Sequence, residues 1–343
     1  MTQRTTLTQF LHEGQRHVAG ATGDFTGLVA DVAVASKTIA NAVGRGALLA
    51  TGDGLAQQLR TLAADLFLEL VSATSHLSAT LSRDDDAIRE TGTRGRYLLT
   101  FVPLSSSSNL DINYQTGTIF SILRAPDPDR SAREDDFLQP GREMECAGLV
   151  QYSGSTRLVL ATRLGVDGFT LDRELGEYVL THPDVTVPAA CDEVSVHAVG
   201  SRSWEPPVNR YVRECIAGAD GPRGRDFRLR WSASLVADAS RILTRGGVFL
   251  HPHGANTRNG DHLSLLTEVN PVAWIVERAG GRAITGRNDI LDLQPTGIDQ
   301  RVPLLFGSRD EVDRLHSHHI DYTEGRDGAD DEQPLFTTRS LFR

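Results

Sequence analysis

The chain has 343 residues and a formal net charge of -10. That length supports a core that needs no disulfide or structural metal. The negative charge argues against sequence-independent binding of nucleic acid or an anionic membrane, because both depend on summed positive charge. Three cysteines without a CxxC pair suit a reducing compartment, and the N-terminal sequence lacks the apolar run of a signal peptide. We therefore expect a cytoplasmic protein with neither nucleic acid nor membrane as a partner.

The first half of the chain changes from helical to strand-like patterns near residue 96. Apolar residues recur on one face of residues 7–18, 25–49 and 57–73, which predicts three amphipathic helices. Alternating residues and glycine-containing turns between 149 and 183 predict antiparallel hairpins. The sequence VTVPAACDEV that follows is typical of a domain junction. We expect an N-terminal domain over residues 1–184 with helices, a mixed sheet and a serine-rich loop.

The second half alternates helices and strands. Residues 231–247 predict a helix with Gly246 as its C-terminal cap, which leads directly into the strand VFLH. Such alternation favours helices and mixed sheets arranged in layers. We expect a C-terminal α/β domain over residues 185–322 and a flexible acidic tail over residues 323–343.

Two further helix starts carry capping signals. Asn270 is expected as the N-cap of a helix, with Pro271 at its first position, where the missing N–H costs nothing. Ser308 followed by Glu311 fits a capping box, in which each side chain would bond to the other residue's backbone N–H. Both signals are local, so they depend on these side chains having no stronger partner elsewhere.

Four consecutive serines, Ser105 to Ser108, follow a short apolar run that predicts a strand. Small polar residues at a strand end let several N–H groups and hydroxyls converge on one anion, which predicts a phosphate cradle. Phosphoryl chemistry usually also needs a hard cation held by carboxylates, and this turn has no acid before Asp111. A polar turn without a ligand is the alternative interpretation.

Residues 96–123 resemble the signature of class 1 fructose-1,6-bisphosphatases, which reads Asp-Pro-Leu-Asp-Gly-Ser-Ser-Asn-Ile-Asp and continues into Gly-Thr-Ile-Phe-Ser-Ile. The resemblance extends over GFTLDRELGEYVLTHP, GPRGRDFRLRW, RILTRGGVFL, EVNPVAWIVERAGG and the ending PLFTTRSLF. It implies an α/β, layered sugar-phosphatase (fructose-1,6-bisphosphatase/inositol monophosphatase-like) fold and a homotetramer. It also implies Mg²⁺-dependent hydrolysis of fructose 1,6-bisphosphate to fructose 6-phosphate and phosphate, in the Calvin cycle or gluconeogenesis.

The same resemblance places different residues at most of the family's metal ligands. The two signature aspartates of the family fall on Val102 and Ser105, and neither side chain adds a negative charge. The family's paired glutamates align with Arg83 and Asp84, and an aspartate of its catalytic loop aligns with Arg60. The implied metal ligands that remain are Glu268, the backbone carbonyl of Leu104 and, weakly, Asp84.

The resemblance also implies the residues that contact substrate. The serine loop matches the phosphate-contacting part of the signature, Arg230 matches an arginine that reaches the 6-phosphate of a neighbouring subunit, and histidines replace an asparagine, a tyrosine and a basic residue of the family. No residue is assigned as catalytic. The implied substrate contacts are Ser106, Ser107, Ser108, Asn109, His197, Arg230, Trp231, His251 and His262.

Three interpretations of function remain open on the sequence. The first is a fructose-1,6-bisphosphatase whose activity is weak or lost, because carboxylates of the metal cage are replaced. The second is an inactive relative that binds a sugar phosphate or a nucleotide, or that assembles with an active relative and regulates it. The third is different, metal-free chemistry on a phosphorylated compound, marked by His197, His251 and His262.

Overall fold

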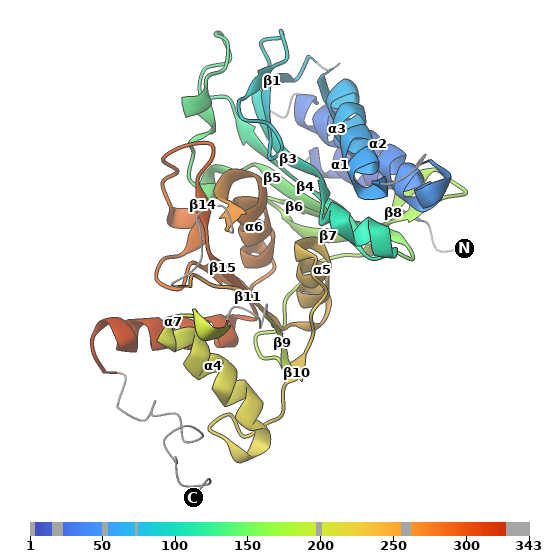
Figure 1. The fold of residues 1–343 in the computed structure, drawn as a ribbon. Coiled ribbons are helices and arrows are strands. Elements are labelled where there is room, and N and C mark those ends of the chain that lie inside the picture. The colour runs from blue at the N-terminus through green and yellow to red at the C-terminus, as the bar shows by residue number, and fades with distance from the viewer. Residues whose placement is uncertain are drawn as a thin grey trace, which may run out of the picture.

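Helices and β-sheets alternate in layers through the molecule (Figure 1). The computed structural model describes residues 4–15, 23–49, 54–72, 75–196, 201–254 and 262–326. Helices α5 (Leu235–Arg245) and α6 (Asn270–Arg278) lie between an eight-stranded and a five-stranded sheet, and one apolar core joins all three layers. Further helices cover the outer face of each sheet. The layered α/β arrangement is therefore as predicted.

The larger sheet has the strand order β2-β1-β3-β4-β5-β6-β7-β8. Strands β1 and β3 pair in parallel, and the pairs that follow along the sheet are antiparallel, as the predicted hairpins require. Every residue of β3 is buried, because helices cover both faces of the sheet. The strands are β1 (Leu77–Ser82), β2 (Arg89–Glu90), β3 (Tyr97–Ser105), β4 (Thr116–Arg124), β5 (Cys146–Tyr152), β6 (Thr156–Thr162), β7 (Gly165–Asp172) and β8 (Glu177–His182).

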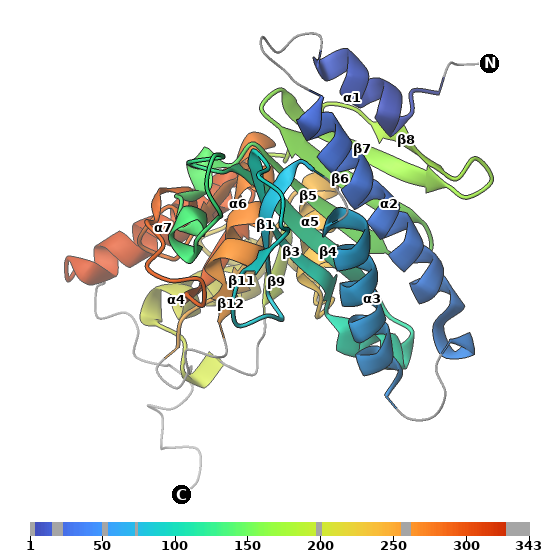
Figure 2. The same ribbon diagram turned by 90° about the horizontal axis from the view of Figure 1, so that it is seen from above.

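Helices α1 (Leu7–Gln15), α2 (Asp24–Arg45) and α3 (Leu55–Ser72) cover the outer face of this sheet (Figure 2). Their apolar faces form one core with the sheet, and the ring of Phe67 stacks on that of Phe101 with centroids 4.4 Å apart. The three predicted amphipathic helices are therefore present. Residues 16–18 and 73, at the ends of two of the predicted ranges, lie outside the described residues.

The smaller sheet has the order β10-β9-β11-β15-β13. One of its faces contacts α5 and α6, with the rings of Phe249 and Phe306 5.2 Å apart. Helices α4 (Pro206–Ala217) and α7 (Arg309–Thr323) cover the other face. The remaining strands are β9 (Glu193–Val196), β10 (Arg228–Leu229), β11 (Val248–His251), β12 (Leu263–Ser264), β13 (Arg282–Ile284), β14 (Arg301–Val302) and β15 (Leu304–Gly307), of which β12 and β14 form a separate pair.

The predicted capping box at the start of α7 was wrong. The Ser308 hydroxyl accepts a hydrogen bond from the Gly247 N–H at 3.1 Å and makes no cap bond to α7. The Glu311 carboxylate accepts from the Tyr211 hydroxyl at 2.7 Å. Long-range partners thus outcompete the local ones. The predicted cap of α5 is confirmed, because the Gly246 N–H donates to the carbonyl of Ile242.

No helix in the described part of the chain is long and apolar enough to cross a bilayer. The three cysteines are buried and unpaired, as expected for a chain that does not depend on disulfides. Residues 327–343, which make up most of the predicted acidic tail, lie outside the described residues.

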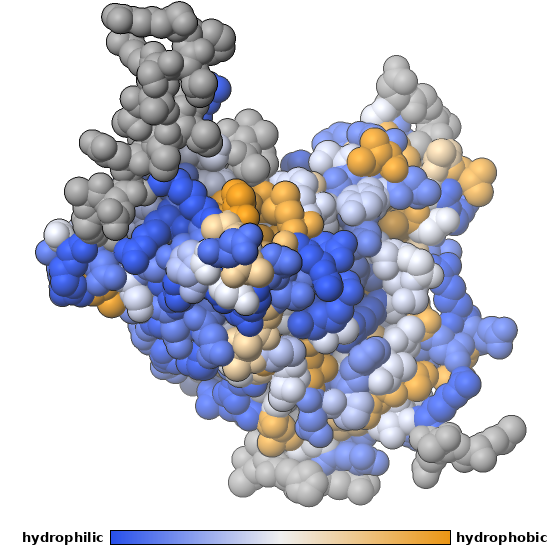
Figure 3. All heavy atoms as spheres, turned by 90° about the horizontal axis from the view of Figure 1, so that it is seen from below, coloured by the Kyte–Doolittle hydropathy of each residue, from blue (hydrophilic) through white to orange (hydrophobic). Residues whose placement is uncertain are grey.

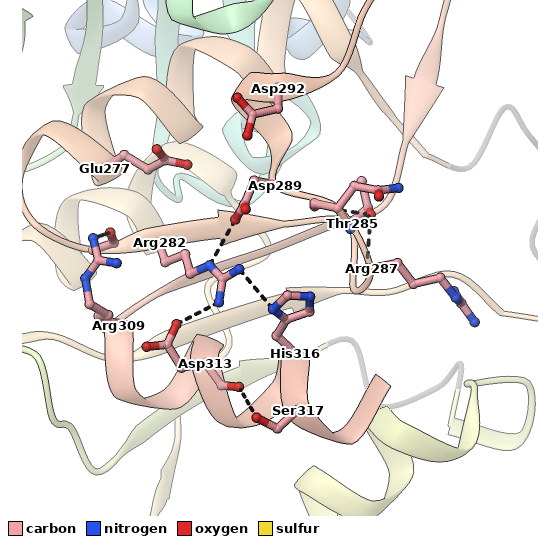
Figure 4. Close-up of polar contacts among 12 residues, drawn as sticks. Glu277, Arg282, Thr285, Arg287, Asp289, Asp292, Arg309, Asp313, His316 and Ser317 are labelled. Carbon is pink, nitrogen blue, oxygen red and sulfur yellow. Dashed lines mark hydrogen bonds and ion pairs between the residues drawn. The ribbon is translucent and has the colours of Figure 1, made fainter. Parts of the chain in front are cut away.

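A network of charges fastens α7 to the smaller sheet (Figure 4). The Arg282 guanidinium on β13 donates to Asp289 at 2.9 Å and to Asp313 at 2.8 Å, and its third nitrogen lies 2.9 Å from Nδ1 of His316. Asp313 and His316 belong to α7, so one cation ties helix, strand and the following loop together. Hydrogen bonds to a charged group are worth about 1.5–3 kcal/mol each, more than neutral ones.

Glu277 on α6 lies near this network without a comparable partner. Its Oε1 is buried and makes no hydrogen bond to the described residues, and the nearest cation, Arg142, is 3.8 Å from Oε2. Burial raises the pKa of Glu277, Arg142 opposes the shift, and the charges of Asp289 and Asp292 add to it. The result is a pKa of about 7, against an ordinary value of 4.5.

We predict that Glu277→Gln stabilises the protein at pH 8. Between pH 4.5 and 7 the folded state holds a proton that the unfolded state releases, so the free energy of unfolding falls as pH rises through this window. Glutamine mimics the protonated acid, so we expect a gain of about 2 kcal/mol at pH 8 and a much smaller one at pH 5. Urea unfolding at both pH values measures it. The exposed Glu174→Gln is the control, and an equal gain at both pH values would contradict the assignment.

Candidate active site

The serine loop lies where strand β3 ends. Ser106 adopts a left-handed conformation, with φ 57°, and the chain then turns into the short 3₁₀ helix η2 (Ser107–Ile112). A register shift in the β3–β4 ladder precedes the turn. Positive φ is uncommon for a residue with a side chain, so the loop has a specific shape that the surrounding structure holds in place.

Asn109 fixes this loop from inside. The residue is buried, and its side-chain amide donates to the carbonyl of Gln115 at 2.9 Å and to that of Ala233 at 3.4 Å. Ala233 immediately precedes the N-cap of α5, so the amide joins the loop to the central helix layer. The side chain of Asn109 therefore stabilises the loop. The predicted contact between Asn109 and the substrate remains a prediction.

The hydroxyls of Ser106, Ser107 and Ser108 are the groups of this loop that can meet an anion. Ser106 and Ser107 are half-buried and Ser108 is exposed. Their side chains make no hydrogen bond to the part of the chain that the structure describes, unlike Thr116, whose hydroxyl donates to the Ser105 carbonyl at 2.5 Å. A phosphate with several acceptor oxygens fits such a set of free donors.

Val102 and Ser105, the two positions that the resemblance matches to family aspartates, are buried. Val102 is fully buried in the core between the two sheets, and Ser105 is 2% exposed. The Leu104 side chain points into the core beneath α1–α3. A valine in this environment stabilises packing and offers no ligand.

An ion-pair cluster lies beside the serine loop, at the end of strand β1. We call Arg60, Arg83, Asp84 and Glu268 the arginine–acid cluster. Arg83 Nη1 donates to Glu268 Oε1 at 3.1 Å and Arg83 Nη2 to Asp84 Oδ1 at 3.2 Å, while Arg60 Nε is 3.3 Å from Asp84 Oδ2. The backbone N–H of Arg83 also bonds to Phe101 of β3, which places the cluster next to the strand that leads into the loop.

Glu268 is held from two sides. It lies in a π-helical turn, η8 (Leu265–Val269), that runs directly into α6, so Asn270 starts that helix and is not its N-cap as predicted. Its carboxylate accepts from the Ser264 N–H at 3.0 Å and from Arg83, and its side chain is 5% exposed. A carboxylate this deeply buried needs a compensating charge, and Arg83 provides it.

Arg83 remains a cation in this setting. Burial would lower its pKa, but the charges and hydrogen bonds of Glu268 and Asp84 outweigh burial and hold the pKa above its ordinary value. The cluster thus contains two guanidinium groups and two carboxylates, and its formal charge is zero. A neutral cluster with a fixed cation at its centre repels a second cation more than an acidic cage does.

These residues do not fit a bound Mg²⁺. Magnesium needs near-octahedral oxygen ligands with carboxylate charge, whereas both acids of the cluster already share Arg83. The described residues contain no group of three histidine, cysteine or acidic side chains that could hold a metal ion. The cofactor implied by the resemblance therefore lacks a matching donor set here, and Glu268, Leu104 and Asp84 stay untested as ligands.

The predicted sugar-phosphate end is only partly described. His251 and His262 lie near each other with ring centroids 5.9 Å apart, and His253, which the sequence interpretation missed, shares a 3.1 Å hydrogen bond between its Nδ1 and Nε2 of His262. His253 lies two residues after His251, which was predicted as a site residue. That short spacing was the feature of the sequence from which His253 could have been predicted. His197 lies outside the described residues.

Arg230 and Trp231 directly follow strand β10. Both residues line a cavity that contains no member of the arginine–acid cluster. The guanidinium of Arg230 is half exposed and pairs with Glu193 at 3.3 Å. Glu193 was not singled out from the sequence, because its partners are 37 and 48 residues away and no local pattern marks them.

Known proteins identify the fold. Residues 5–183 match the family model "Fructose-1-6-bisphosphatase, N-terminal domain", and residues 187–320 match "Fructose-1-6-bisphosphatase, C-terminal domain". The chain is 44% identical, over 352 aligned positions, to a protein of Hydrogenophilus thermoluteolus named fructose-1,6-bisphosphatase class 1, covering 98% of this chain and 97% of that protein.

Solved structures agree. The fructose-1,6-bisphosphatase of Leishmania major in its holo form has a TM-score of 0.84 at 32% identity, covering 92% of this chain and 99% of that chain. The apo form of the same enzyme gives 0.84 at 33% identity, with 93% and 100% covered. The fold is thus that of a layered sugar phosphatase. The chain belongs to the class 1 fructose-1,6-bisphosphatase family, and both the predicted fold class and the predicted family are confirmed.

We predict strong coupling between Arg83 and Glu268. Arg83→Met leaves a buried carboxylate without its counter-charge and should lower the free energy of unfolding by about 3–5 kcal/mol, whereas adding Glu268→Gln should restore most of that loss. Urea unfolding of the two single variants and the double variant measures the coupling. The exposed pair of Arg89 with Asp85 is the matched control, with an expected coupling below about 1 kcal/mol. Additive effects at Arg83 and Glu268 would contradict the assignment.

Proposed function

We propose that this protein recognises fructose 1,6-bisphosphate, or a closely related sugar bisphosphate, and hydrolyses it slowly or not at all in the presence of Mg²⁺. Membership of the fructose-1,6-bisphosphatase family supports the substrate class. The proposed weakness of the reaction is supported by the 3.1 Å ion pair between Arg83 and Glu268, since Glu268 is one of the acids that the resemblance implies as a metal ligand.

The physical argument concerns charge. Enzymatic hydrolysis of a phosphate monoester requires acceleration of up to about 10²¹-fold, and metal ions supply much of it when present, by polarising the phosphate and activating water. Val102 and Ser105 add no carboxylate, and Asp84 and Glu268 are each neutralised by a guanidinium. Arg83 can attract a phosphate directly, but a guanidinium cannot generate the hydroxide that attacks it.

Recognition can persist without that chemistry. The free hydroxyls of the serine loop offer donors to one phosphate, and the guanidinium of Arg230 offers a charged fork for another on a neighbouring subunit. His251 and His262 lie near each other, with ring centroids 5.9 Å apart, and their ring nitrogens are further groups for an anion to contact. If the site is inactive, we propose that the chain has a regulatory role, in which it binds the substrate or assembles with an active relative.

We predict that purified protein releases phosphate from fructose 1,6-bisphosphate at less than about 0.01 per second with Mg²⁺ or Mn²⁺, against about 10 per second for a typical enzyme. The residual rate should change less than about twofold in Glu268→Ala, because that acid is already engaged by Arg83. Malachite green detection of phosphate measures it. Metal-dependent release that Glu268→Ala abolishes would show that the family reaction survives.

We also propose that the chain forms a homotetramer in the cytoplasm, within the carbohydrate metabolism of the Calvin cycle or gluconeogenesis. Several large apolar side chains are exposed, among them Ile112 at 74% and Leu48 at 85%. Ile112 lines a hollow of about 860 Å³ between the end of α2 and η2, and Leu48 directly follows another lining residue, Ala47. On the face seen in Figure 3, hydrophobic residues gather in a few separate places on a mostly hydrophilic surface. Contact with another copy would cover such side chains.

We predict that Ile112→Glu shifts the protein from a tetramer to a smaller species, because a charge would have to be buried in the contact. Size-exclusion chromatography with light scattering measures the mass. Leu164 is similarly exposed, at 64%, but lies in the turn between β6 and β7, so Leu164→Glu is the control and should leave the mass unchanged. A wild-type monomer, or a tetramer unaffected by Ile112→Glu, would contradict this assignment.

A further inference from the structure

A cationic cavity lies outside the arginine–acid cluster. A cavity of about 560 Å³ opens between α5, the β5–β6 strands and β10. Four arginines line it, from β6, β10 and α5, together with a single acid, Asp238. We call this cavity the arginine pocket, and its arginines are Arg157, Arg230, Arg241 and Arg245.

Arg241 and Arg230 form the fixed wall of the arginine pocket. Arg241 Nη1 donates to Glu193 at 2.9 Å and its Nη2 to Asp238 at 3.2 Å, while Arg230 donates to the same Glu193 at 3.3 Å. Asp238 also accepts from the Ser232 hydroxyl at 2.6 Å. These two acids compensate these two cations, so this part of the pocket is neutral and rigid.

Arg157 is the exception. It extends from β6, and its Nη1 donates to the Thr244 hydroxyl at 3.0 Å, but its Nε is buried and makes no hydrogen bond to the described residues. No carboxylate of the described chain lies within 4 Å of it, and burial lowers its pKa. The space for this side chain comes from Gly168, where an added Cβ would be 3.3 Å from Arg157 Nη2.

A half-buried guanidinium without a counter-charge is costly, because the desolvation of an ion amounts to several kcal/mol. Arg245, at the last turn of α5, adds a second cation that has no ion pair among the described residues. Together they leave the arginine pocket with two uncompensated positive charges. Trp231 and Tyr114 border the same cavity and offer ring surfaces to the organic part of a ligand.

We propose that the arginine pocket binds a small phosphate-bearing metabolite, with Arg157 and Arg245 as its charged contacts. A phosphate dianion matches the two free charges, and the fork of a guanidinium matches its oxygens. The family resemblance gives Arg230 a role toward a neighbouring subunit and gives Arg157 and Arg245 none. The site is separate from the serine loop, and it does not depend on whether that loop binds substrate.

Titration calorimetry with inorganic phosphate tests the proposal. To remove any contribution from the arginine–acid cluster, the measurements use the full chain carrying both Arg83→Met and Glu268→Gln, since the second change should restore most of the stability that the first removes. In this background, Arg157→Gln and Arg245→Gln should each weaken phosphate binding at least about tenfold, as expected for the loss of one charge-assisted contact. The exposed Arg94→Gln is the control and should leave the affinity unchanged.

A second readout separates binding from folding. Without phosphate, Arg157→Gln should unfold at the same temperature as its parent or higher, because it removes an uncompensated charge, and added phosphate should raise that temperature less than it does for the parent. Phosphate affinity that is unchanged in both variants would overturn the proposal. So would a change in molecular mass with unchanged phosphate affinity, since the arginine pocket would then be a contact between subunits.

Discussion

The ion pair between Arg83 and Glu268 organises the part of the molecule beside the serine loop. It joins the end of strand β1 to the π-helical turn before α6, two segments separated by 185 residues in the chain. Because both side chains are largely buried, neither can be removed alone without leaving a charge in a medium that solvates it poorly. The pair therefore fixes both the geometry and the charge beside the serine loop.

The layers of the fold make that pair possible. The parallel register of β1 with β3 brings Arg83 beside Phe101, a few residues before the serines, and the packing of α6 on the larger sheet brings Glu268 to the same edge. The same layers leave room for a core that accepts a valine at position 102. The family fold is thus retained, and the arginine–acid cluster at this edge of the sheet has a formal charge of zero.

The sequence predicts local features well. Amphipathic periodicity identified α1 to α3, and the cap at Gly246 follows from a residue that tolerates the required conformation. It could not predict which distant partner a polar side chain would choose. Ser308 accepts a hydrogen bond from Gly247 instead of capping its own helix. Glu193 forms ion pairs with Arg230 and Arg241, which belong to other segments of the chain. The candidate site shows the same limit, since the resemblance placed Arg83 and Arg60 at positions of family acids but could not predict that Arg83 pairs with Glu268.

The most direct test of the central claim is a calorimetric titration of Mn²⁺ into the wild-type protein, without substrate. If the Arg83 guanidinium has taken the place of a metal ion, no binding with a Kd below about 1 mM should be seen, that is, nothing more favourable than about -4 kcal/mol. Binding of one Mn²⁺ per chain with a micromolar Kd, lost in Glu268→Ala, would contradict the account. It would mean that Glu268 is free to leave Arg83 and that the acidic site still operates.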